Sequence, residues 1–220
     1  MNEANARLQK IADFVQNYLH DSYQKRSKKD KANLDRYLFG ADYRWQHTLR
    51  VAQFGKVIAE NEGADVELVA AACLLHDIAW FDTKAENSRE HGRLGAEKAR
   101  SILKELGFNL EQIENICSSI IAHTEDTHPE TLESKILSDA DNVDRFGPYR
   151  ILQWCFADIE DYEKLSAKLS ERIHRLEQYR EENPIFTSTG QQLFAEQLNL
   201  QLRFFCEFVG EKALSVMPQI

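Results

Sequence analysis

The chain has 220 residues, 43% of them apolar and 29% charged, and this globular composition excludes disorder or low complexity as a description of the whole chain. Lys and Arg total 27 against 36 Asp and Glu, so the net charge is −9, which argues against general nucleic-acid binding but allows a local pocket for a small phosphorylated ligand. The longest apolar run, Val69 to Leu75, is far shorter than the roughly 20 residues of a membrane span.

Apolar residues recur almost everywhere at intervals of three and four, so the sequence predicts an all-α protein. We expect helices over roughly 3–26, 42–60, 64–75, 90–106, 110–123 and 132–146. The helix over 64–75 is apolar almost all round, which indicates a buried central helix. The basic stretch 25–31 predicts a solvated connector, and Gly147-Pro148 predicts the end of the last of these helices.

Beyond Pro148 the pattern changes to two amphipathic helices that are separated at Asn183-Pro184. The expected apolar stripes are Tyr162, Leu165, Leu169, Ile173 and Leu176 on the first, and Leu193, Gln197, Leu200 and Phe204 on the second. We expect these helices to form an antiparallel hairpin within 151–220, packed on a helical core formed by 1–150 and belonging to the same domain.

The cysteines and the N-terminus indicate a cytoplasmic protein. Cys73, Cys117, Cys155 and Cys206 are widely spaced, without the C-x-x-C pairs of a zinc ribbon, and each has apolar neighbours. We therefore expect buried free thiols in a reducing compartment. The first residues alternate charged with apolar side chains and lack the apolar centre of a secretory signal.

Several apolar helix faces include a histidine. The residues are His47, His76 and His123, and Asp77 directly follows His76 at the end of the most apolar helix. Burying an unpaired carboxylate costs several kcal/mol, and a bound metal ion is one way to offset that cost. Imidazole nitrogens together with a carboxylate oxygen suit a first-row divalent ion or zinc.

The order of these residues resembles a known family. His47, then His76-Asp77 in LLHDIAW, then an Asp in SDADNVDRFG is similar to the H…HD…D pattern of HD-domain metal-dependent phosphohydrolases, over roughly residues 40–150. The resemblance implies a helical bundle in which His47, His76, Asp77 and the late Asp bind a divalent ion. It does not distinguish Mn, Co, Fe, Mg and Zn.

The late Asp has several candidates, because Asp139, Asp141 and Asp144 all lie on one predicted helix. Helical periodicity does not choose among them. The family's usual Ala-Asp step favours Asp141 as the ligand, with Asp139 as the next candidate. Asp144 would then orient a ligand histidine.

The resemblance leaves the number of ions open. His91, in EHGRLGAEKA, and His123 resemble extra ligands of two-metal members, in which Asp77 would bridge the ions. In one-metal members, histidines at similar positions contact the substrate instead. His128 fits an exposed loop.

The implied chemistry is phosphoryl transfer to water. A bound ion polarises a phosphoryl oxygen and lowers the pKa of its water from about 15.7 towards about 7. Basic side chains must offset the charge that develops on the phosphoryl oxygens, and the candidates near the motifs are Arg44, Arg50, Lys84, Arg93 and Arg145. We expect Asp77, Arg50, Lys84 and Arg145 to act in catalysis.

The leading hypothesis is a phosphohydrolase that cleaves a phosphate monoester or diester of a small molecule such as a nucleotide. Ala79-Trp80 stands where cyclic-dinucleotide phosphodiesterases of the superfamily carry Gly-Lys, and Thr124 follows His123 in place of their Gly-Tyr-Pro signature, so that subfamily is disfavoured. The alternatives are a di-iron oxygenase of the same fold and a non-catalytic protein that binds metal or nucleotide. The sequence is compatible with a homo-oligomer.

Overall fold

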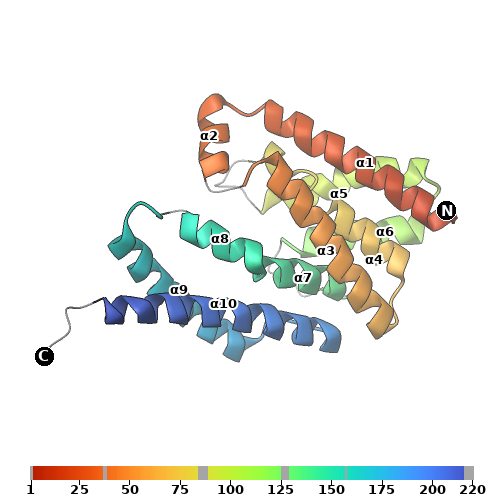
Figure 1. Cartoon of the computed structure of the whole chain (residues 1–220). Coiled ribbons are helices and arrows are strands. Elements are labelled where there is room, and N and C mark those ends of the chain that lie inside the picture. The colour runs from red at the N-terminus through yellow and green to blue at the C-terminus, as the bar shows by residue number, and fades with distance from the viewer. Residues whose placement is uncertain (1, 37–38, 84–88, 125–128, 157, 216–220) are drawn as a thin grey trace, which may run out of the picture.

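The computed structural model describes residues 2–36, 39–83, 89–124, 129–156 and 158–215. Every regular element in these ranges is helical, which confirms the all-α prediction (Figure 1). The elements are α1 (Glu3–Gln24), α2 (Lys28–Arg36), α3 (Ala41–Glu62), α4 (Val66–Leu75), the 3₁₀ helix η1 (Trp80–Asp82), α5 (Glu90–Glu105), α6 (Leu110–Ala122), α7 (Leu132–Arg145), α8 (Pro148–Phe156), α9 (Tyr162–Glu182) and α10 (Ser188–Leu214).

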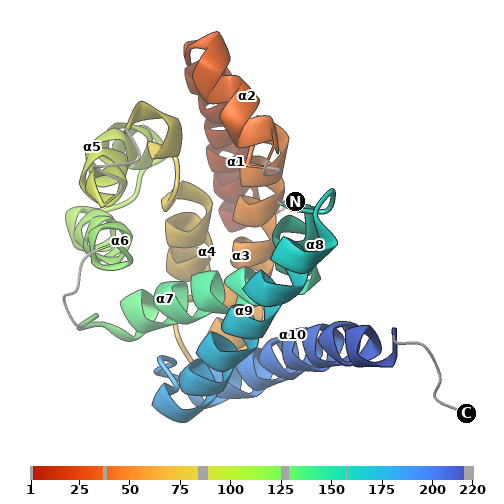
Figure 2. The ribbon, with the colours of Figure 1, turned by 90° about the vertical axis from the view of Figure 1, so that its left-hand side faces the viewer.

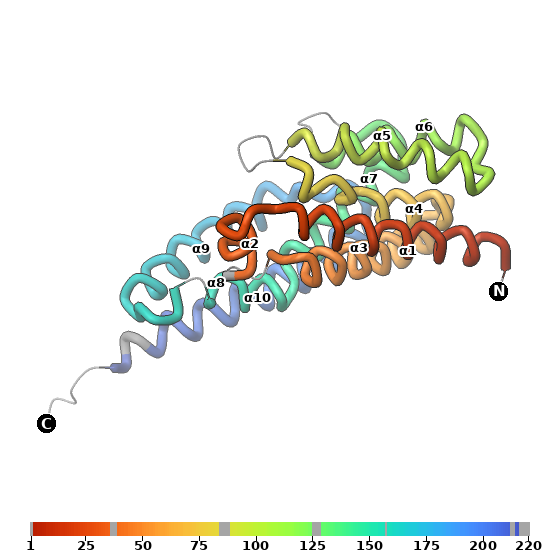
Figure 3. Tube along the Cα trace, turned by 90° about the horizontal axis from the view of Figure 1, so that it is seen from above, coloured from red at the N-terminus to blue at the C-terminus, as the bar shows by residue number. Residues whose placement is uncertain are grey.

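Helix α4 is the centre of the N-terminal part of the molecule. Asp65 caps its first turn by accepting hydrogen bonds from two backbone N–H groups, and every residue from Leu68 to Leu75 is buried. It packs against α1, α3, α6 and α7, while α5 and α6 lie side by side along one edge of the molecule (Figure 2 and Figure 3). Since α4 ends inside this core, the residues that follow it, His76 and Asp77, are buried as well.

Although α4 is strongly apolar, it has only 10 residues. In the described part of the chain, none of the helices combines the length and the apolar character that crossing a bilayer requires.

Helix α7 joins two hydrophobic clusters. Ile136, Leu137 and Ala140 pack into the cluster built around α4. One turn further on, Val143 and Phe146 pack into a second cluster with residues of α8, α9 and α10. The last two helices lie side by side beneath α7, which confirms the expected C-terminal hairpin (Figure 1).

Two short helices differ from the expectation. The basic stretch 25–31 is a connector only up to Ser27, whose hydroxyl accepts a hydrogen bond from the Asp30 N–H at the start of α2. The spacing of apolar residues does not predict helix α2, because its residues are almost entirely polar. Helix α7 ends before Gly147-Pro148 as expected, but Pro148 also begins the unexpected helix α8, since the fixed φ of proline suits the first position of a helix.

The expected apolar stripe of α10 is wrong by one residue. Its buried side chains include Phe194, Leu198 and Phe205, whereas Leu200 and Phe204 are 42% and 43% exposed. Apolar residues stand on both sides of the stripe, so spacing alone could not fix which face of α10 turns inward.

The expectation of buried thiols is only partly confirmed. Cys73 and Cys117 are buried and Cys155 is half-buried, whereas Cys206, which follows the buried Phe205, is exposed.

Candidate metal centre

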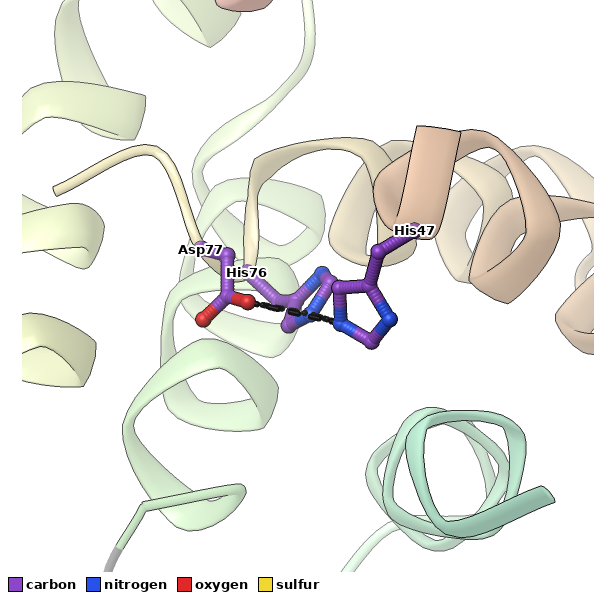
Figure 4. A group of neighbouring side chains, drawn as sticks. All are labelled: His47, His76 and Asp77. Atoms are coloured by element: carbon purple, nitrogen blue, oxygen red, sulfur yellow. Dashed lines mark hydrogen bonds and ion pairs between the residues drawn. The ribbon is translucent and has the colours of Figure 1, made fainter. Parts of the chain in front are cut away.

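The ends and inner faces of several helices bring histidines and carboxylates together beside α4. The contributing residues are His47 from α3, His76 and Asp77 after α4, His91 from the first turn of α5, His123 at the end of α6, and Asp141 and Asp144 from α7. Figure 4 shows the side chains of His76 and Asp77 turned towards His47. Close packing of the helices therefore positions the whole group.

Asp77 lies between two pairs of histidines. Its Oδ2 atom is 3.4 Å from His47 Nε2 and 3.2 Å from His76 Nε2. Its Oδ1 atom is 3.0 Å from His91 Nε2 and 3.6 Å from His123 Nε2. In each group of two histidines and Asp77, the potential ligand atoms all lie within 4.8 Å of one another. This arrangement has the dimensions of two metal-binding groups that share one carboxylate.

Hydrogen bonds fix which ring nitrogens face the cluster. His76 Nδ1 lies 2.7 Å from the Cys73 carbonyl oxygen, and His123 Nδ1 lies 2.5 Å from that of Ile120. Because a carbonyl oxygen only accepts, both Nδ1 atoms carry a proton, and each ring turns its Nε2 atom towards Asp77.

Nitrogen atoms also face each other directly. His47 Nε2 is 3.3 Å from His76 Nε2, and His91 Nε2 is 3.2 Å from His123 Nε2. Lone pairs at such distances repel unless a cation or a proton lies between them. Converging imidazole nitrogens with a carboxylate are the donors of a transition-metal or zinc site, so these residues fit a divalent ion.

The charges of the group perturb one another strongly. Burial opposes the imidazolium form of His47, but the carboxylates of Asp141, Asp144 and Asp77 outweigh burial and raise the pKa of His47 well above its usual value. Burial likewise opposes ionisation of Asp77, yet the charges of His76 and Arg44 hold the pKa of that carboxyl well below its usual range. Burial is the main cause that lowers the pKa of His123. The centre therefore keeps its carboxylates ionised.

The three candidate carboxylates of α7 have different partners. Asp139 accepts hydrogen bonds from the backbone N–H groups of Phe186 and Thr187, so it anchors the connection between α9 and α10. Asp141 places Oδ1 3.3 Å from His47 Nε2, on the side of the histidine cluster. Asp144 places Oδ2 2.6 Å from His47 Nδ1, on the opposite edge of the same ring. Only Asp141 of these three faces the nitrogen that His47 turns to the cluster.

The metal-binding groups open into a cavity of about 600 Å³. Its lining is Leu34, Phe39, Tyr43, Arg44, His47, Asp77, Trp80, Arg89, His91, His123, Thr124, Asp141, Arg145 and Arg150. Burial and the neighbouring charges of Arg145 and Arg44 lower the pKa of Arg150. An acidic chain thus gathers guanidinium groups around one cavity, beside aromatic rings.

The expected basic residues have different positions. Arg145 lines the cavity, whereas Arg50 donates to both carboxylate oxygens of Asp144, from Nε at 2.5 Å and Nη2 at 3.2 Å. Arg93 is exposed on α5, and Lys84 lies outside the described residues, as does His128. Arg150 also lines the cavity, but the sequence did not predict it, because it follows the last motif and belongs to no recognisable periodic pattern.

Comparisons with known proteins match the part of the chain that contains the candidate metal centre. Residues 44–145 match the family model described as HD domain. The chain is 32% identical over 103 residues to ribonuclease Y of Borrelia garinii subsp. bavariensis, but this match spans only 19% of that protein's length. It is 26% identical over 168 residues to the uncharacterized protein YpgQ of Bacillus subtilis, covering 73% of this chain and 80% of YpgQ.

Solved structures share the fold along most of the chain. The crystal structure of Bacillus subtilis YpgQ with selenomethionine has a TM-score of 0.65 at 20% identity, covering 96% of both chains. A predicted HD superfamily hydrolase from an uncultured Thermotogales bacterium has a TM-score of 0.61 at 24% identity, covering 90% of this chain and 91% of that chain. YpgQ has also been crystallised in complex with ADP, in a structure with a TM-score of 0.60 at 20% identity that covers 93% of this chain and 96% of that chain.

Proposed function

We propose that the protein is a metal-dependent phosphohydrolase of a small phosphorylated molecule, with a nucleotide as the first candidate, and the match of residues 44–145 to the HD domain model supports this proposal. The observation that carries the proposal is a pair of buried histidine–carboxylate groups opening into an arginine-lined cavity. The complex of YpgQ with ADP supports a nucleotide.

The ligands divide naturally into two sets. His47, His76, Asp77 and Asp141 would hold one ion, and His91, His123 and the other oxygen of Asp77 would hold a second. When bound, a divalent ion supplies Lewis acidity, which polarises a phosphoryl oxygen and activates water for attack. Asp77 would contribute to both sets and keep them at a fixed separation.

The cavity side chains would bind the substrate. Arg145 and Arg150 offer planar guanidinium groups that can each donate to two phosphoryl oxygens, and no ion pair occupies either of them within the described ranges. Phe39 and Trp80 present aromatic surface to the same cavity, which suits a stacked base or another flat group. Removing a single charge-assisted contact by Arg145→Ala would lower kcat/KM about ten- to a hundredfold.

The test is a substrate panel with a matched control. Nucleoside mono-, di- and triphosphates, sugar phosphates and phosphodiesters are incubated with the protein and added Mn²⁺, Co²⁺, Mg²⁺ or Fe²⁺, and released phosphate is measured. Asp77→Asn keeps the side-chain volume but removes the shared charge, so we expect it to lose both metal and turnover. Asp139→Asn changes another buried carboxylate, away from the cluster, and should keep both.

Two outcomes would contradict the proposal. Full metal content and full turnover in Asp77→Asn would remove this group from the chemistry. No hydrolysis of any substrate, together with oxygen consumption by the iron-loaded protein, would favour the di-iron oxygenase instead.

The number of ions is tested by metal analysis of His91→Ala and His123→Ala. With two ions, each variant should lose one ion per chain and keep the ion of the His47 group. One ion in the wild type and in both variants, with impaired turnover, would assign these histidines to substrate contact.

A further inference from the structure

Arg44 occupies an unusual position for a cation. It lies on α3 one turn before His47, its side chain is 6% exposed, and its Nη1 atom donates to Asp77 Oδ2. Its guanidinium lies over the Trp80 ring, 3.7 Å from the centroid. Its Nε atom is buried and has no hydrogen-bond partner among the described residues. The guanidinium also lies 5.6 Å from the centroid of the Tyr43 ring, so the charge of Arg44 is held in place by one carboxylate oxygen and two aromatic rings.

That carboxylate oxygen is also a candidate metal ligand. Of the two Asp77 carboxylate oxygens, Oδ2 is the one that faces His47 and His76, so Arg44 and an ion in this group would share one acceptor. In a buried site, two cations that share one carboxylate repel strongly, because little water screens them. The lining of the cavity adds Arg145 and Arg150 to the same positive region.

We propose that Arg44 opposes metal binding at Asp77, and that an anion in the cavity relieves this opposition, so that metal and phosphate bind cooperatively. The proposal rests on the metal site of the proposed function. Before metal binds, Arg44 neutralises the buried charge of Asp77. When metal and an anion are both present, the anion offers the guanidinium a second partner, because Arg44 lines the cavity. By linkage, the metal must then tighten phosphate binding by the same factor.

The test is a binding cycle that needs no turnover. Mn²⁺ is titrated into the wild type and into Arg44→Met by calorimetry, with and without inorganic phosphate. Methionine keeps much of the apolar stem but removes the charge. We expect Arg44→Met to bind Mn²⁺ more tightly than the wild type in the absence of phosphate, by roughly tenfold. Phosphate should tighten Mn²⁺ binding to the wild type and have a smaller effect on the variant.

Arg7→Met is the matched control. Arg7 also pairs with a carboxylate, Glu67, and lies 4.6 Å over the Phe108 ring, but it belongs to α1 and is not part of either metal-binding group. It should leave both Mn²⁺ affinities unchanged. Should Arg44→Met fail to fold, Arg44→Lys retains the charge and should remain close to the wild type in the same cycle, and tighter Mn²⁺ binding by Arg44→Lys would contradict the proposal.

The outcomes separate this proposal from the proposed function. Weaker or unchanged Mn²⁺ binding by Arg44→Met would show that Arg44 supports the site or is irrelevant to it, and an equal phosphate effect in both proteins would overturn the coupling. A wild type that binds no Mn²⁺ would overturn the metal site and both proposals with it. Mn²⁺ binding with the expected cycle but no hydrolysis would overturn the proposed function alone.

Discussion

Among single residues, Asp144 connects the surface to the candidate metal centre. It is buried, accepts from His47 Nδ1 and receives Arg50 on both oxygens. A carboxylate on the far nitrogen of a metal-binding imidazole fixes the ring orientation and makes the ring a stronger ligand. Arg50 in turn prevents the carboxylate from rotating away.

Asp144→Asn should therefore weaken metal binding by about ten- to a hundredfold while the protein stays folded. The measurement is metal affinity by competition with a chelating dye, alongside a urea unfolding curve. Asp139→Asn, on the same helix, should lower the free energy of unfolding without changing metal affinity. Equal losses of affinity in both variants would mean that α7 as a whole, rather than the bond to His47, carries the effect.

Tyr23 gives a prediction for alkaline pH. Burial and a 2.5 Å hydrogen bond to Asp35 Oδ1 raise the pKa of Tyr23 from 10.0 to about 12. Because the pKa of Tyr23 is higher in the folded state, its contribution to stability is fully present at pH values below the pKa of the unfolded state. This contribution is lost as the pH rises through the pKa of the folded state. Tyr23→Phe should cost about 0.5–1.5 kcal/mol at pH 8, and the difference from the wild type should shrink between pH 10 and 12. Urea unfolding at pH 8 and pH 11 measures it, and a constant difference would exclude this link.

At the scale of helices, the close approach of α5 and α6 sets the position of His91. A Cβ atom placed on Gly92 would overlap Thr124 and lie 2.9 Å from the Ile120 carbonyl oxygen. A Cβ on Gly95, one turn along the same helix, would meet its neighbours at 3.5 Å, an ordinary contact. Glycine at position 92 therefore lets the helix that carries His91 reach the helix that ends at His123.

Gly92→Ala should separate these helices at the end that carries His91. Overpacking of this kind costs about 1–3 kcal/mol, and displaced His91 should reduce metal content at its group. Gly95→Ala is the control, and it should be neutral or stabilising by up to about 1 kcal/mol, because alanine favours the helix. Thermal unfolding and metal analysis on both variants test this, and unchanged metal content in Gly92→Ala would contradict it.

The sequence could predict the long helices and the convergence of the histidines, because both follow from apolar spacing. His47, His76 and His123 each continue an apolar stripe, and a stripe turns inward whatever the rest of the fold does. The same reasoning does not predict α2, because α2 has no apolar stripe. It also does not identify the buried face of α10, because Phe204 and Phe205 are adjacent and only Phe205 is buried. Spacing also fails for the cavity, because Trp80 and Arg150 meet there from distant parts of the chain.

For the whole molecule, the sharing of α7 by two hydrophobic clusters predicts one cooperative unit. Residues of α7 pack with α4 on one side and with α9 and α10 on the other, so neither cluster can open without exposing part of the other. Trp80 borders the first cluster and Trp154 the second. Their fluorescence can therefore report each half separately.

Variants that keep only Trp80 or only Trp154 should give coincident urea unfolding curves. Coincidence of two local probes is the signature of two-state unfolding, which is expected when the C-terminal hairpin belongs to the same domain as the core. A lower midpoint for the Trp154 variant would show instead that the hairpin unfolds as a separate unit. Each variant would first be compared with the wild type by circular dichroism, so that a change in overall stability is not mistaken for a separate transition.

The anchoring of α7 by Asp139 also has a consequence for biosynthesis. Its partners, the N–H groups of Phe186 and Thr187, stand 47 and 48 residues further along the chain. On the ribosome, His47, Asp77 and the histidines of α5 and α6 are synthesised long before this anchor. The nascent protein therefore carries all of these metal-binding side chains before Asp139 can tie α7 to the connection between α9 and α10, so the link between α7 and the C-terminal hairpin forms only after that connection has been synthesised.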